Sequence, residues 1–211
     1  MTVSILGRDP LYAAQLIWDL ELYHAIFSVL PTGIKASIPS KLLEIAPTDA
    51  LATVSVLRAL FSGDNNLPPL HSAFLSLMQE DPALKARFYL AGLLLPYLGI
   101  TYRDGKAKTQ STVSAVIRES LKLGTQNHYL DGVPALFAGI PILKNGMEKC
   151  QHMSRAQLGL LLRNKFIHNP TIGVHWSTSI FFSLVTELVP CYSIKDDKFY
   201  REYHSKKINR S

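Results

Sequence analysis

The stretch Leu160–Trp176, LLLRNKFIHNPTIGVHW, decides the fold class of this chain. Its first half combines apolar residues at helical spacing with two cations, Arg163 and Lys165. A polar turn over residues 168–173 follows, and a second apolar helix then opens with a histidine (His175) and a tryptophan. Two packed helices that present cations and aromatic rings at one corner suit the binding of a polyanion.

The same helical spacing recurs along the rest of the chain. Asp9-Pro10 and Asp81-Pro82 each place an N-cap residue before a proline, and Ser154 is a further N-cap. No alternating strand of convincing length is present, and no repeat of fixed period. The sequence predicts an all-α array of eight or nine helices without a significant sheet, in a body-like region (1–124) and a tail-like region (125–211). The expected helices span about 10–30, 48–62, 68–79, 82–98, 109–123, 134–147, 154–167 and 177–189.

Positive charge gathers in the second half of the chain. Residues 1–100 hold 6 Lys or Arg against 8 Asp or Glu, whereas residues 101–170 hold 10 against 4. An anionic partner is therefore expected to bind the second half. A basic but merely solvated surface is the alternative, because many basic proteins bind no nucleic acid.

The cysteines and the apolar runs bear on the compartment. Cys150 and Cys191 form no C-x-x-C pair, which fits a reducing compartment. The longest apolar helical stretch, 11–30, contains Asp19, Glu21 and His24, so we expect no membrane span and no membrane partner. We also find no signal peptide, and expect a soluble, intracellular protein.

No catalytic centre is recognisable. Asp19-x-Glu21 is the nearest approach to a paired metal-binding motif, but residues two apart on a helix face different directions. Asp196-Asp197 lies in a polar tail. His168 and His175 could approach each other across the turn, yet no acid or cysteine near them in the sequence completes a metal site. We therefore expect no metal and no catalytic residue, and interpret the Cys150 thiol as structural.

Seven side chains are our candidates for binding an anionic partner. The alternative for each cation is that it lies on a solvated helix surface. The alternative for His168 is that it is a turn residue hydrogen-bonded to the backbone. We place Trp18 in the core and favour a core role over base stacking for Trp176. The candidates are Arg118, Lys122, Arg155, Arg163, Lys165, His168 and His175.

Three segments resemble the helical region of eukaryotic, fungal-like CCA-adding tRNA nucleotidyltransferases of class II. They are GRDPLYAAQLIWDLELYHAIF (7–27), VIRESLKLG (116–124) and LGLLLRNKFIHNPTIGVHWSTSIFFSLVTELV (158–189). The third is the most specific, because a His-Asn-Pro turn followed by Gly-x-His-Trp is an unusual combination. The resemblance implies an enzyme whose head binds Mg²⁺ through carboxylates, whose neck selects CTP and ATP, and whose body and tail grip tRNA.

The resemblance covers the body and tail alone. The paired aspartates of the head and the Glu-Asp-x-x-Arg motif of the neck have no counterpart here, so no catalytic or nucleotide-selecting residue is carried over. We expect a tRNA-binding portion that is inactive by itself, holds no cofactor, has tRNA and the head and neck as partners, and lies in the mitochondrion, cytosol or nucleus. The alternative is a freestanding helical protein-interaction module that binds no RNA. An exposed apolar face near the N-terminus, where the neck would dock, fits both hypotheses.

Overall fold

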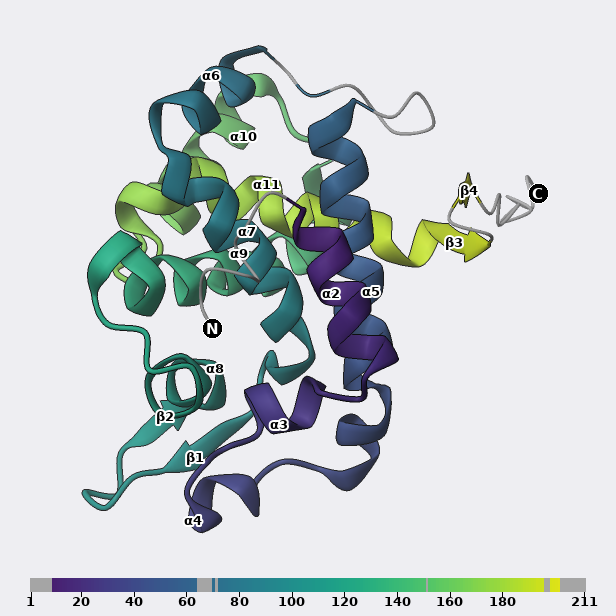
Figure 1. Cartoon of the computed structure of the whole chain (residues 1–211). Helices are drawn as coiled ribbons and strands as arrows, with labels where there is room; N and C mark the ends of the chain where they lie inside the picture. The colour runs from purple at the N-terminus through teal and green to yellow at the C-terminus, as the bar shows by residue number, and fades with distance from the viewer. Residues whose placement is uncertain (1–8, 64–69, 71, 151, 196–197, 202–211) are drawn as a thin grey trace, which may run out of the picture.

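The computed structural model describes residues 9–63, 70, 72–150, 152–195 and 198–201 (Figure 1). Helices dominate this part of the chain, and the all-α prediction is confirmed. The longer helices are α2 (Pro10–Asp19), α5 (Ser40–Ser62), α6 (Ser72–Glu80), α7 (Pro82–Leu94), α9 (Tyr129–Cys150), α10 (Arg155–Leu162) and α11 (Trp176–Leu188). Short helical turns connect them: α3 (Tyr23–Phe27), α4 (Thr32–Lys35), η1 (Leu95–Tyr97), α8 (Thr112–Ala115), η2 (Val116–Ser120), η3 (Gln126–His128), η4 (Arg163–Ile167), η5 (Gly173–His175) and η6 (Val189–Cys191).

Local capping chemistry sets several of these helix starts. The carboxylates of Asp9 and Asp81 each accept a backbone N–H from the first turn of the helix that follows, and a proline occupies the next position. Ser154 and Gln157 form a reciprocal capping box at the start of α10. These three starts agree with the sequence prediction, because a cap depends on residues within one turn of each other.

Two helices begin earlier than the sequence predicted and contain internal prolines. α5 begins at Ser40 instead of Thr48 and continues through Pro47. α9 begins at Tyr129 instead of Pro134, and contains Pro134 and Pro141. A proline inside a helix removes one backbone hydrogen bond. Packing of α9 along α11, and of α5 along α2 and α7, offsets that loss.

Two short antiparallel hairpins accompany the helices. β1 (Thr101–Arg103) pairs with β2 (Thr109–Ser111), and β3 (Tyr192–Lys195) pairs with β4 (Lys198–Arg201). The segment 102–108 comprises the end of β1 and the turn of the first hairpin, and residues 192–195 and 198–201 of the polar C-terminal region form the second. Strands of three or four residues are too short to show a recognisable alternation.

Aromatic rings fill the space where α5, α6, α7 and α11 meet. Phe88 is fully buried and packs on Phe74 and Phe181, and Phe61 contacts the same group. Figure 1 shows α2 lying alongside α5, on the outside of this core. The core continues across residue 124, since Phe88 and Phe182 stack at 6.2 Å. The boundary between the two regions stays a prediction.

α5 is the one described helix that is long and apolar enough to cross a membrane, by length and composition alone. Half of that apolar stretch is buried inside the protein. A helix buried in a protein core can have the same length and composition. Packing against α2 and α7 accounts for the apolar composition of α5.

Candidate functional sites

α10 and η4 form a surface helix with very little cover. None of the residues of α10 is buried. Phe166 in η4 is buried and anchors this segment to the core. The turn that follows is held by Asn169, whose side-chain Oδ1 accepts the backbone N–H of Thr171 at 2.9 Å and of Ile172 at 3.3 Å. The predicted polar turn is present, and it leaves the polar side of α10 and η4 open to solvent.

The cations on this surface are exposed and form no ion pair with any described residue. Arg155, Arg163 and Lys165 are exposed, and no carboxylate in the described part of the chain lies within ion-pair distance of them. The reason lies in the sequence, because no Asp or Glu stands between Glu148 and Glu187. We call the exposed cations of α10 and η4 (Arg155, Arg163 and Lys165) the basic corner.

His168 contacts one residue of the basic corner, Arg163. The Arg163 Nε donates a hydrogen bond to His168 Nε2 at 3.1 Å, so this ring nitrogen is an acceptor and carries no proton in that arrangement. The interaction aligns the guanidinium along the helix surface. The sequence prediction of a backbone-bonded or phosphate-binding His168 did not include this pairing.

The two remaining cations lie elsewhere and are already paired. Arg118 Nε donates to Glu119 Oε1 at 2.9 Å, and Lys122 Nζ lies 3.6 Å from Glu119 Oε2. Arg118 lies in η2 and Lys122 just beyond its end; η2 continues α8 and packs on α3 and α9. Figure 1 shows α8 below α9 and α10 above it. The candidate cations therefore form two separate groups, and Glu119 neutralises much of the charge of the first.

Both tryptophans are more exposed than the sequence suggested. Trp18 is 45% exposed and Trp176 is 40% exposed, so the expected core role is wrong for each. On α2 the buried positions are Ala14 and Ile17, and Trp18 lies beyond the edge of that face. Trp176 is the first residue of α11, where one side of the helix still faces solvent.

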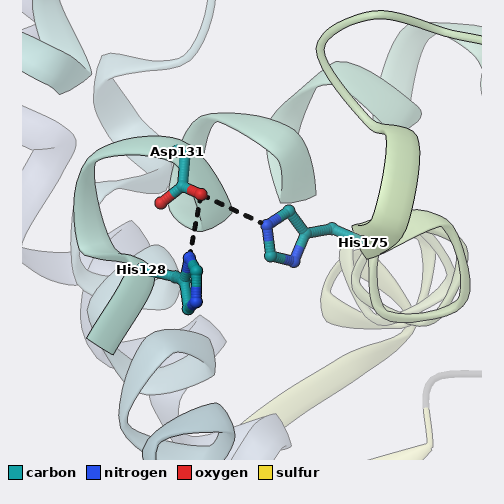
Figure 2. Close-up of side chains that lie close together, drawn as sticks. All are labelled: His128, Asp131 and His175. Atoms are coloured by element: carbon teal, nitrogen blue, oxygen red, sulfur yellow. Dashed lines mark hydrogen bonds and ion pairs between the residues drawn. The ribbon is translucent and has the colours of Figure 1, made fainter. Parts of the chain in front are cut away.

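His175 takes part in a second cluster, which sequence analysis did not find. Figure 2 shows His128, Asp131 and His175 pointing toward one another. His128 Nδ1 lies 2.9 Å from Asp131 Oδ2, and His175 Nε2 lies 3.6 Å from the same oxygen. The sequence near His175 offers no acid to complete a metal site; the fold supplies Asp131. Asp131 is far from His175 in the sequence, so no local spacing could have revealed it.

The backbone before α9 is shaped to present His128. Asn127 and His128 have φ angles of 57° and 54°, in the left-handed region that costs non-glycine residues roughly 1–2 kcal/mol each. Arg87, which is buried, holds them there by donating from Nη1 to the Asn127 carbonyl at 3.0 Å, while it is ion-paired with Asp81. A Cβ on Gly132 would lie 3.1 Å from the Arg87 Cδ, so α9 approaches this arginine closely.

Asp131 is ionised readily in this setting. Partial burial raises the pKa of its carboxyl group, but hydrogen bonds from His128 and from the backbone N–H groups of Asp131 and Gly132 outweigh that effect. The net result is a pKa below the ordinary aspartate value. A carboxylate beside two imidazoles is the donor set that zinc-class metals accept, so this cluster could hold such an ion.

The remaining acidic candidates form no comparable cluster. Asp19 accepts a hydrogen bond from Gln15 at 2.8 Å on the surface of α2, and Glu21 lies beyond the end of that helix. In the described residues, the group whose ligand atoms lie together is His128, Asp131 and His175. Asp196-Asp197 lies outside the described residues, and so does the side chain of Cys150.

Comparisons with known proteins give no relative to this chain: no family model, no curated protein and no solved structure matches it.

Proposed function

We propose that this chain binds folded tRNA, and that the basic corner is where it contacts the phosphates. The observation that carries the proposal is that no carboxylate among the described residues lies within ion-pair distance of Arg155, Arg163 or Lys165. Exposed cations without acidic partners keep their charge available, and a phosphate backbone is the ligand that gains most from it. Arg118 and Lys122 contribute less, because Glu119 must be displaced first.

The exposed side chains that follow the polar turn suit RNA better than a simple anion. Trp176 and Val174 are exposed on the segment that follows the polar turn. An exposed indole can stack on an unpaired base, and rigid helices can measure the shape of a folded RNA through its phosphates. Neither contact requires recognition of base edges, so we expect binding to many tRNAs alike.

The role that fits this binding is the tRNA grip of a CCA-adding nucleotidyltransferase, the family that the sequence resembles. In that arrangement a head and neck supply the Mg²⁺, CTP and ATP chemistry, and this chain supplies affinity for the tRNA body. By itself it should add no nucleotides, since gripping the substrate does not stabilise the reacting phosphate. Its compartment would be that of the tRNA, in the mitochondrion, cytosol or nucleus.

Charge reversal tests the proposal. Arg163→Glu with Lys165→Glu should weaken tRNA binding at least about tenfold in fluorescence anisotropy. If both side chains contact phosphates, it should also lower the slope of log affinity against log salt by about 2. The matched control is Lys35→Glu with Lys41→Glu, which makes the same change in net charge on α4 and α5. Equal loss in both double variants would mean that overall charge, and not the basic corner, attracts RNA.

A protein-interaction role is the second candidate, and one observation favours it. α2 and the residues after it carry exposed apolar side chains, among them Leu16, Trp18, Leu20 and Leu22. A segment this rich in exposed apolar side chains is a candidate docking surface. Under the tRNA-binding proposal the head and neck would dock on it too, so Trp18→Glu with Leu20→Glu should leave tRNA binding unchanged but abolish association with a separately expressed head and neck of a CCA-adding enzyme. If the parent chain binds no tRNA at low salt, the interaction role is the better explanation.

A further inference from the structure

We propose that His128, Asp131 and His175 form a binding site for a zinc-class divalent metal ion. The ligand atoms are His128 Nδ1, Asp131 Oδ2 and His175 Nε2, all within 4.8 Å of one another. Both imidazoles approach the same carboxylate oxygen from different elements, η3 and η5 (Figure 2). This inference does not depend on tRNA binding.

The spacing of the ligand atoms fits a tetrahedral ion. Zinc bonds to nitrogen and oxygen ligands are about 2.0–2.1 Å long, which places two tetrahedral ligand atoms about 3.3 Å apart. Two of the three separations between ligand atoms, 2.9 Å and 3.6 Å, lie on either side of that value, and the third, between the two imidazole nitrogens, is at most 4.8 Å. Binding of the ion would require rotation of the imidazole rings to bring all three atoms to this spacing.

The chemistry of the donors selects the metal. Two imidazoles and one carboxylate suit Zn²⁺, Co²⁺ or Ni²⁺, whereas Mg²⁺ and Ca²⁺ prefer a shell of oxygen ligands. Three protein ligands leave a fourth position for water or an external ligand. The His128 and Asp131 side chains are 62% and 59% exposed, so solvent reaches that position.

The surroundings hold the ligands in place before any metal binds. Buried Arg87 fixes the carbonyl of Asn127, and this keeps His128 in its left-handed conformation. The His175 side chain is only 15% exposed and sits at the junction of η5 and α11. A bound ion would join the start of α9 to the start of α11, and would fix the turn that presents Trp176.

A simpler explanation exists for part of the arrangement. His128 directly precedes α9, so its contact with Asp131 could be an ordinary hydrogen bond at a helix start. That explanation does not account for His175, which approaches the same oxygen from η5, a segment far from Asp131 in the sequence. The two explanations differ in whether all three side chains contribute to metal affinity.

The test uses the full chain without an affinity tag and Zn²⁺ alone as the probe. Titration against a chromophoric chelator should show one Zn²⁺ per chain. His128→Gly, Asp131→Asn and His175→Ala should each lower the affinity at least about tenfold. His24→Ala, which removes another exposed imidazole, should leave it unchanged. Co²⁺ should give the visible bands of a tetrahedral site in the parent and in His24→Ala.

Folding defects do not obscure this test. His128 is exposed, and glycine adopts its positive φ without strain, so His128→Gly should keep its fold. Zn²⁺ should raise the melting temperature of the parent and of His24→Ala, but not of His128→Gly. The proposal is overturned if the parent binds no Zn²⁺, if His128→Gly binds it as tightly as the parent, or if equimolar Mg²⁺ displaces it.

Discussion

Replacement of Gly139 by alanine should destabilise the whole fold, because α9 and α11 meet at this glycine. A Cβ at position 139 would lie 2.3 Å from the Ser179 Oγ, 2.9 Å from the Ser183 Oγ and 3.0 Å from the Phe166 Cε1. All three neighbours are fully buried. The Ser179 hydroxyl also donates to the Ala135 carbonyl at 2.8 Å, so it cannot move away without losing that bond.

Three effects set the magnitude. Overpacking a core costs roughly 1–3 kcal/mol. Displacing the Ser179 hydroxyl leaves a buried polar group without a hydrogen bond, which costs about another 1–3 kcal/mol. Alanine has a higher helix propensity than glycine, and this offsets roughly 1 kcal/mol of the cost. The net loss in the free energy of unfolding is therefore about 3 kcal/mol, which lowers the melting temperature by roughly 6–12 °C in a chain of this size.

Thermal and urea unfolding followed by circular dichroism would measure this loss. Gly159→Ala is the matched control, because a Cβ there meets nothing within 4 Å on exposed α10. It should raise stability by about 0.5–1 kcal/mol. In a Ser179→Ala background the penalty of Gly139→Ala should shrink, since the closest clash is gone. A melting temperature for Gly139→Ala within 2 °C of the parent would refute the argument.

Two further predictions concern hydrogen bonds. Tyr23→Phe should lower the free energy of unfolding by about 1–2 kcal/mol in urea titrations, because the buried hydroxyl donates to the Leu93 carbonyl at 2.7 Å; an unchanged midpoint would contradict this. The Asp104 carboxylate accepts the backbone N–H groups of Lys108 and Lys106, and the first of these bonds is the main cause of its lowered pKa. The Asp104 carboxylate stabilises the β1–β2 turn at pH values above the ordinary aspartate pKa, and this stabilisation is lost as the pH falls through the lowered pKa of Asp104. The NMR chemical shift of the Lys108 amide should follow that titration in the parent and should show no such titration in Asp104→Asn.

Much of the helical architecture was readable from short-range signals. The starts of α2, α7 and α10 follow from Asp9, Asp81 and Ser154, since a cap and its partners lie within one turn. The starts of α5 and α9 were missed, because long-range packing overrides the tendency of proline to break a helix. The tRNA-binding function stays a proposal, supported by charge and exposure.

The sequence by itself determined the all-α class, three helix starts and the polar turn after η4. Each depends on neighbours in the chain: caps, helical periodicity and turn residues. Only the tertiary structure decided that Trp176 is exposed, that Arg163 and Lys165 have no carboxylate within ion-pair distance among the described residues, and that Asp131 meets His175. The physical reason is that burial and the meeting of distant side chains depend on how the helices pack, and no local pattern encodes which residues they bring together.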